Sequence, residues 1–260
     1  MADFEQNVTP LAGTDFGEVQ IKTENNGSRA TVYLGADDSR HSNRLTYDTT
    51  TAKIAGTYLL GDHIISGGYE YEKLDVFNLF VQHTEGEFRF DSIEDFRNGD
   101  AARVYYYNAN NTNNPNDAAA KFGYEIHTAY LQDEYFNYDH DLTVTFGLRY
   151  DWYSSDDYPV ENPLIEELYG FSNRQNLDGE GLLQPRLGIN WQPMEELEVR
   201  GGIGLYSGGN PNVWLGNNYQ NNGIVLIQTQ ERGVNLFETE MTGDGRPVWN
   251  VPQNQYDAVA

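Results

Sequence analysis

Residues 142–153, with the sequence LTVTFGLRYDWY, alternate between two kinds of side chain. Every second position from Leu142 to Trp152 is apolar or aromatic, whereas the positions between them are mostly polar and include Arg149 and Asp151. Successive side chains of a β-strand point to opposite faces, so this period of two predicts a strand with one apolar and one polar face. The same pattern recurs along the chain and predicts strands near residues 44–60, 62–83, 121–137, 141–154, 184–192 and 197–207.

Weaker alternation at 17–25 and 29–36 indicates one or two further strands of the same sheet. Helix signals are confined to 91–99 and 161–170, where an Asp cap or an early proline is followed by a glycine stop. We expect both helices to be short. Strands should pair with their neighbours in sequence, in antiparallel order, because simple up-and-down connections force that pairing.

The connections between the predicted strands alternate in length. Those near Gly61, at 138–141 and at 193–196 are tight turns, whereas the connections that follow residues 83 and 153 are long, as is the chain after Tyr206. A transmembrane β-barrel has this connectivity, with short periplasmic turns and long extracellular loops. Soluble β-sandwiches seldom have long loops at every second connection. The alternation of short and long connections therefore predicts an all-β fold, a segment of an antiparallel up-and-down transmembrane β-barrel.

We divide the chain accordingly into three parts. N-terminal strands and a loop of the barrel segment occupy 1–43, six antiparallel barrel strands with their loops occupy 44–207, and a long extracellular loop region occupies 208–260.

The strand at 142–152 has about the 9–11 residues that a tilted strand needs to cross a bilayer. Its apolar face would meet lipid, with Tyr150 and Trp152 near the headgroups, and aromatic residues should gather at two heights. The residues expected to point outwards together are Val144, Phe146, Leu148, Ile189, Trp191, Val199 and Ile203. Those expected on the opposite, polar face are Arg149, Arg186, Asn190 and Arg200. The alternative is a half-buried strand over a soluble core, which alternates in the same way.

Composition narrows the class of protein. The 260 residues carry a formal net charge of -24, which disfavours nucleic acid as a partner because phosphate-binding surfaces are basic. There are no cysteines, so disulfides, thiol nucleophiles and thiolate metal sites are excluded. No run of about 20 apolar residues predicts a membrane helix, and the opening MADFEQNVTP does not resemble a signal peptide.

Several segments in this order resemble the barrel of TonB-dependent outer-membrane receptors, particularly the Oar-like group. They are HIISGGYEYEKLDVFNLFVQHTEGEFRFDSIEDFRNG, YLQDEYF with LTVTFGLRYDWY, and LLQPRLGINWQP with LEVRGGIGLYSGGNPNVWLGNNY. The resemblance implies a barrel of about 22 strands, closed by an N-terminal plug, in the bacterial outer membrane. It also implies import of a scarce organic substrate of the siderophore, peptide or glycan class with energy passed through TonB.

No plug domain and no TonB-box-like segment precede the strands, and the chain ends in NQYDAVA without a terminal aromatic residue. We therefore expect an internal segment of a receptor barrel. The resemblance implies outer-membrane lipid, an extracellular substrate and the TonB system, reached through the plug, as partners, and a surface lipoprotein as a further partner.

No catalytic motif is present, so we expect the protein not to be an enzyme and to need no cofactor. The sequence contains no GxSxG, HExxH, phosphate loop or dinucleotide fingerprint. The five histidines are scattered, and the adjacent pairs Asp133–Glu134 and Asp156–Asp157 would point to opposite faces of a strand. We predict no metal ligands, although carboxylates and Asn carbonyls of the loops could hold calcium.

Two loop segments are candidates for substrate recognition because they place aromatic rings beside amide side chains. The rings supply flat apolar contact area and the amides supply donors and acceptors, which suits peptides or sugars. The candidate residues are Trp214, Tyr219, Asn210, Asn212 and Asn217 in one segment and Tyr105, Tyr106 and Tyr107 in the other. The alternative is that Asn and Gly form turns and the tyrosines belong to a strand extension or an aromatic girdle.

Two other classes of protein remain open from sequence. One is a secreted, acidic, soluble β protein such as a carbohydrate-binding module, whose sheets would bury their apolar faces against each other. The other is a structural or adhesive surface β protein. A lipid-exposed apolar band would favour the receptor over both.

Overall fold

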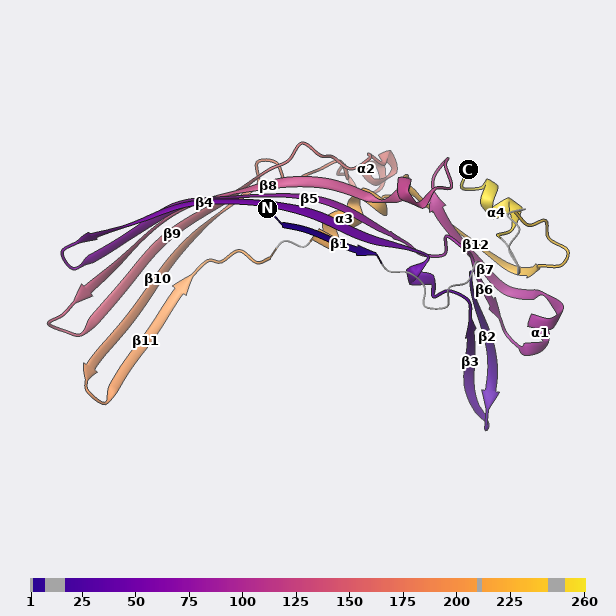
Figure 1. Ribbon diagram of the computed structural model, residues 1–260, viewed down its shortest axis with the longest axis horizontal. Helices are drawn as coiled ribbons and strands as arrows, with labels where there is room; N and C mark the ends of the chain where they lie inside the picture. The colour runs from indigo at the N-terminus through magenta and orange to yellow at the C-terminus, as the bar shows by residue number, and fades with distance from the viewer. Residues whose placement is uncertain (1, 8–16, 210–211, 243–250) are drawn as a thin grey trace.

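The computed structural model describes residues 2–7, 17–209, 212–242 and 251–260 and contains two β-sheets (Figure 1). The first is a seven-stranded sheet in the order β1-β4-β5-β8-β9-β10-β11. Its strands are β1 (Ala2–Asn7), β4 (Ser42–Leu60), β5 (His63–Val81), β8 (Ala120–Asn137), β9 (Leu142–Ser154), β10 (Gly181–Met194) and β11 (Leu197–Gly204).

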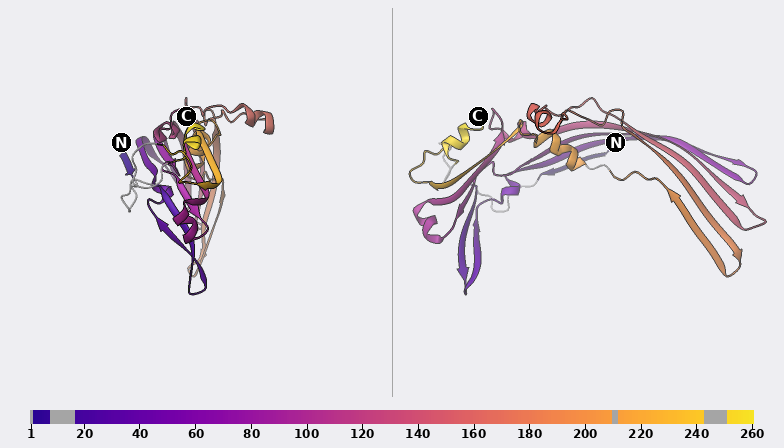
Figure 2. Two further views of the ribbon diagram at one scale, coloured as in Figure 1. Left: turned by 90° about the vertical axis from the view of Figure 1, so that its right-hand side faces the viewer. Right: turned by 180° about the vertical axis from the view of Figure 1, so that it is seen from behind.

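The six predicted strands pair antiparallel with their neighbours in sequence, as expected. Three tight turns fix the register. In the first, Leu60 pairs with His63 across a two-residue turn whose Gly61 has φ +58°, a conformation that glycine adopts without strain. The tight turns lie together at one end of the sheet, opposite the long connections (Figure 2). The predicted fold, an antiparallel up-and-down segment of a barrel wall, is confirmed.

The second sheet has five strands in the order β12-β7-β6-β2-β3 and lies at the end away from the tight turns (Figure 1). It consists of β2 (Glu18–Asn25), β3 (Ser28–Leu34), β6 (Glu87–Phe90), β7 (Asp100–Ala109) and β12 (Leu226–Asn235). The segments 17–25 and 29–36 are therefore strands, but they pair here and not in the seven-stranded sheet, where we had placed them. Sequence alternation shows that a strand forms and does not show its partner.

Two features of the five-stranded sheet were not expected from sequence. Strands β2 and β6 pair in parallel, with Val19 opposite Phe88, and β6, β7 and β12 lie in stretches that we expected to be loops. The sheet has its own core, which includes the buried side chains of Val19, Phe88, Phe90 and Val104. The long connections thus build a packed structure above the seven-stranded sheet.

The helices are short. They are η1 (Asp38–Arg40), α1 (Ile93–Asn98), η2 (Pro115–Ala118), α2 (Pro163–Tyr169), α3 (Asn212–Gln220) and α4 (Gln253–Asp257). The two predicted helices, α1 and α2, are confirmed: the side chains of Ser92 and Asn162 cap their first turns, and Gly99 and Gly170 end them with left-handed backbone. Among the described residues, no helix is long and apolar enough to cross a membrane.

The predicted outward-facing residues share one face of the sheet, because residues directly opposite in neighbouring strands point the same way. Phe146 lies opposite Leu187, which lies opposite Ile203 on its other side, and Trp191 lies opposite Val199. These side chains are exposed, 55 % for Phe146 and 76 % for Ile203. A soluble sandwich would bury them, so that alternative is wrong for these strands. The polar residues Arg149, Arg186, Asn190 and Arg200 lie on the other face, as predicted.

Aromatic side chains gather on the apolar face at two heights. Towards the long loops, the rings of Tyr69, His127, Tyr150 and Trp152 contact one another, with centroids 5.2 Å apart for His127 and Trp152. Near the tight turns lie Tyr58, Tyr135 and Trp191. The β9 residues at the two heights, 144 and 152, lie about 27 Å apart along the strand. At the usual strand tilt of about 35–45° this span projects to about 19–22 Å along the membrane normal, a little less than the apolar band of about 25 Å that aromatic girdles flank in such barrels.

Phe146→Arg should destabilise the receptor in a bilayer by about 2–4 kcal/mol, because the charge would replace an apolar side chain at the lipid face. Thr145→Arg is the matched control, since Thr145 lies next in the same strand on the polar face. Urea unfolding of the intact receptor in phospholipid vesicles measures both. Equal destabilisation by the two variants would contradict the assignment of the faces.

The isolated 260-residue chain should aggregate in buffer without detergent. Strands β1 and β11 are the outer strands of the seven-stranded sheet, so each has one edge of unpaired backbone N–H and C=O groups. The apolar face adds a second surface for association. Size-exclusion chromatography with light scattering tests this expectation, and a stable monodisperse monomer would refute it.

Candidate functional site

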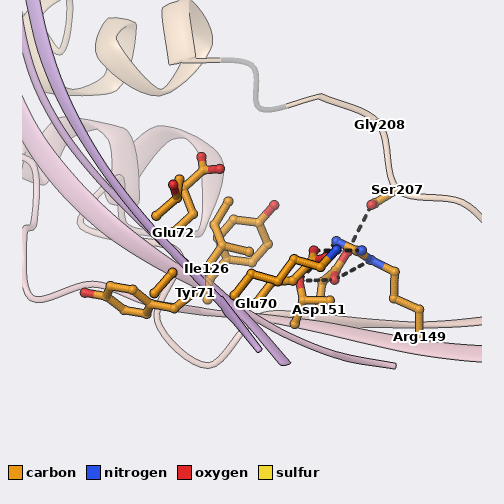
Figure 3. A pocket seen from close by; sticks show the side chains of 13 residues that line it. Glu70, Tyr71, Glu72, Ile126, Arg149, Asp151, Ser207 and Gly208 are labelled. Carbon is orange, nitrogen blue, oxygen red and sulfur yellow. Dashed lines mark hydrogen bonds and ion pairs between the residues drawn. The ribbon is translucent and has the colours of Figure 1, made fainter. Parts of the chain in front are cut away.

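The polar face of the seven-stranded sheet carries a network of charged side chains centred on Arg149 (Figure 3). The Arg149 guanidinium donates to Asp151 Oδ1 at 2.8 Å, to Glu70 Oε2 at 3.3 Å and to Thr128 Oγ1 at 3.1 Å. Glu70 also pairs with Lys53, with Nζ and Oε1 2.5 Å apart. Four neighbouring strands, β4, β5, β8 and β9, are therefore linked across their polar face.

Asp151 is the most buried charged group of this network, with 5 % of its surface exposed. Besides Arg149, its carboxylate accepts hydrogen bonds from Thr128 Oγ1 at 2.6 Å, Gln184 Nε2 at 2.6 Å and Ser207 Oγ at 3.1 Å. A carboxylate removed from water is tolerated when a cation and several donors satisfy it. The arrangement holds the carboxylate in one position.

Gln184 connects this network to the chain that leaves the sheet. Its side chain is fully buried, and besides donating to Asp151 it accepts from the Ser207 backbone N–H at 2.9 Å and from Arg186 Nη2 at 3.2 Å. The segment after β11 is thereby bound back onto the polar face. It then leads towards α3.

A concavity of about 390 Å³ lies over the network, between the sheet and the returning segment. A second concavity of about 280 Å³ shares Lys53, Glu70 and Arg149 with it and continues towards the tight turns. The larger one is lined by Thr51, Ala52, Lys53, Glu70, Tyr71, Glu72, Ile126, Thr128, Arg149, Asp151, Tyr153, Ser207 and Gly208. Its volume is within the range for small organic ligands, and its wall offers both positive and negative groups.

Helix α3 packs on the same face, nearer the long loops. Leu215 and Tyr219 contact the apolar cluster that includes Phe122, with the Tyr219 and Phe122 rings stacked at 5.1 Å. The Tyr219 hydroxyl donates to the Asp157 carbonyl at 2.8 Å, and burial raises the pKa of Tyr219 to about 12. The Tyr124 hydroxyl donates to Asn212 Oδ1 at 2.7 Å. Tyr219 and Asn212, two of the candidate residues, therefore hold the helix in place.

Trp214 differs from them because its side chain is 78 % exposed. Asn217 is also exposed on α3, and its amide oxygen accepts from Asn221 at 3.0 Å. Asn210 lies outside the described residues. Of the candidates in this segment, Trp214 and Asn217 are those whose side chains are exposed.

The three candidate tyrosines lie in β7 and are largely enclosed. Tyr105 stacks on His83 with centroids 5.4 Å apart, and Tyr107 meets the same ring edge-on at 4.4 Å. Tyr106 is buried and its hydroxyl donates to Asn113 at 2.8 Å. Burial also raises the pKa of Tyr107. The structure thus separates these tyrosines from α3 and packs them within the five-stranded sheet.

The alternation in sequence predicted that Arg149 and Asp151 lie on the polar face of their strand, but it did not predict which side chains surround them. Glu70, Lys53 and Gln184 come from other strands, and their positions follow only from the pairing register. The signal available in sequence was that each occupies a polar-face position of its strand. Ser207 gave no such signal, because it is the last residue of the strand predicted at 197–207, whereas β11 ends at Gly204.

An antiparallel sheet with an exposed apolar band between two aromatic levels, a polar opposite face and long connections at one end defines the wall of an outer-membrane β-barrel. The chain belongs to the β-barrel family of TonB-dependent receptors: the family model described as TonB dependent receptor-like, beta-barrel matches residues 4–248. Comparisons with curated proteins and with solved structures gave no significant match.

Family membership makes the protein a bacterial outer-membrane transport receptor, which implies an extracellular substrate and interaction with TonB. Receptors of this family are transporters and not a class of enzymes. The apolar face of the sheet faces the lipid of the outer membrane.

Gln184→Ala should release the segment after β11 from the sheet. The variant leaves the Ser207 amide and the Asp151 carboxylate each without one partner, which costs about 1–3 kcal/mol. Hydrogen exchange of peptides covering residues 205–209 should accelerate by about tenfold, since 1.4 kcal/mol corresponds to that factor.

Gln192→Ala is the matched control, because Gln192 lies in the same strand and is exposed, and its side chain donates to the Glu195 carbonyl in the adjacent turn. Its exchange over residues 205–209 should equal that of the wild type. Unchanged exchange in Gln184→Ala would show that the buried glutamine does not hold this segment.

Proposed function

We propose that the receptor imports an organic substrate of the siderophore, peptide or glycan class, and that the substrate first contacts α3. The observation that carries the proposal is the exposure of Trp214 on a helix whose other side is fixed. Leu215 and Tyr219 anchor α3 to the sheet, so the indole is presented at little cost in conformational entropy.

The polar concavity supports a path from α3 into the barrel. The segment 207–208 lines the concavity and leads directly to the stretch that precedes α3. A substrate leaving Trp214 would next meet Arg149, Glu70 and Lys53, which offer donors and acceptors of both charges. Such a wall suits a polar organic molecule that exchanges one set of hydrogen bonds for the next.

We also propose that a plug carries the contact with TonB and that a surface lipoprotein covers the loops. The support for the lipoprotein is strand β3, an outer strand of the five-stranded sheet, which exposes Val32, Tyr33 and Leu34. An exposed edge strand with apolar side chains is suited to pair with another chain.

Trp214→Ala should weaken substrate binding to whole cells by about tenfold, or about 1.4 kcal/mol, because an exposed aromatic ring that anchors a ligand contributes more than about 1 kcal/mol. Binding of labelled substrate to cells that express the intact receptor at equal surface levels measures this. Trp214→Phe, which keeps a flat apolar ring, should retain most of the affinity.

Tyr138→Ala is the matched control, since Tyr138 is an equally exposed aromatic residue in the turn between β8 and β9, at the opposite end of the sheet. Its binding should match the wild type. Equal affinities for Trp214→Ala and the wild type would remove α3 from the substrate path.

A further inference from the structure

Three chain segments far from α3 bring a histidine and two carboxylates together where the two sheets meet. Asp38 lies in η1, His83 in the turn after β5, and Glu87 at the start of β6. One ligand atom from each of these side chains lies within 4.8 Å of the others. None of these residues belongs to the polar network around Arg149.

Two atoms of this group are buried and have no hydrogen-bond partner. They are Nδ1 of His83, whose residue is 6 % exposed, and Oε2 of Glu87, which is fully buried. The two atoms are 3.0 Å apart and form an ion pair when the imidazole is protonated. A buried polar group without a hydrogen bond costs about 1–3 kcal/mol, and a cation bound between these side chains would remove that cost.

Of the two distances from His83 Nδ1, the one to Asp38 fits the ligand spacing of a small tetrahedral cation and the one to Glu87 is shorter. His83 Nδ1 lies 3.0 Å from Glu87 Oε2 and 3.6 Å from Asp38 Oδ2. Tetrahedral zinc with bonds of about 2.0–2.2 Å places its ligand atoms roughly 3.3–3.6 Å apart. An imidazole nitrogen favours zinc and similar transition metals over calcium or magnesium, which take oxygen ligands.

Neighbouring side chains hold the three residues in this orientation. Arg89 pairs with the other carboxylate oxygen of Glu87, Oε1, so that Oε2 faces His83. Gln82 Nε2 donates to Asp38 Oδ2 at 3.2 Å, and the rings of Tyr105 and Tyr107 contact the His83 imidazole. Metal ligands are commonly oriented by such outer contacts.

The charge balance also favours a cation. Glu18 is a third carboxylate at this point and is buried like Glu87, whereas Asp38 is partly exposed; Glu18 Oε2 accepts from the Asp38 backbone N–H at 2.8 Å. The nearby His41 has both ring nitrogens occupied, by the Ala36 carbonyl and by the Glu85 backbone N–H, and so is not a ligand. Three carboxylates with one arginine leave negative charge that a divalent ion would offset.

We infer that Asp38, His83 and Glu87 bind a zinc-like divalent cation that fastens the five-stranded sheet to the seven-stranded sheet. Water completes the coordination shell. The ion links η1, which leads into β4, to the turn and strand that follow β5. Tyr105 and Tyr107 then act as positioning residues for its histidine ligand.

The test is zinc binding to the full chain in detergent after chelator treatment, with bound metal measured by mass spectrometry after dialysis. The wild type should retain about one zinc ion per chain that excess calcium does not displace. His83→Ala and Glu87→Gln should each lower this occupancy at least tenfold. His63→Ala should not, because His63 is partly exposed beside Asp133 in the tight-turn region.

Equal zinc content in His83→Ala and the wild type would overturn the inference, because the metal would then be held by other acidic groups. Since a buried histidine variant can fail to fold, cobalt(II) added to the wild type gives a second readout. Nitrogen and oxygen ligands in a tetrahedral site produce visible d–d absorption that stoichiometric zinc abolishes. No cobalt-dependent absorption would likewise overturn the inference, and would leave a protonated His83 beside Glu87 as the explanation of the cluster.

Discussion

The structure depends on the backbone pairing register of β4, β5, β8, β9, β10 and β11. Side chains alternate between the two faces of each strand, so a slip of one residue in β9 would move Phe146 to the wet face and Arg149 to lipid. Three tight turns fix this register, and cross-strand neighbours such as Phe146 and Leu187 then share the lipid face. On the other face, the same register brings Arg149 opposite Tyr130 and Gln184 and within reach of Glu70.

The polar face changes character along its length. At membrane height it carries the network of Arg149, Asp151 and Glu70, which a wetted lumen can accommodate. Nearer the loops the same face becomes apolar at Val76 and Phe122, and α3 covers it. One continuous set of strands therefore provides a lipid-facing wall, a polar lining and a platform for the helix that presents Trp214.

The long connections are tied down by interactions with distant parts of the chain. The five-stranded sheet joins segments from before β4, from between β5 and β8, and from after β11, and it buries its own apolar core. The segment after β11 is bound by Gln184 and Asp151, and the junction of the sheets is formed around His83. Fixed loops can hold recognition residues in place, which lowers the entropy lost on binding.

The sequence by itself determined six of the seven strands of the barrel wall, their neighbours and their two faces, because a period of two and three short turns are local signals; the pairing of β1 with β4 was not predicted. The residues from Val144 to Ile203 that were expected at the lipid face lie there, and the glycine stops of α1 and α2 were also predicted, whereas Ser92 and not the expected Asp caps α1. Only the tertiary structure decided which strands pair with β2 and β3 and that Tyr106 is buried. It also decided the contacts of Gln184 with Ser207 and of Asp38 with His83. Gln184 and Ser207 are 23 positions apart, and the β2 and β6 partners Val19 and Phe88 are 69 positions apart. Local periodicity does not encode such contacts, since they depend on how the long connections fold back over the sheet.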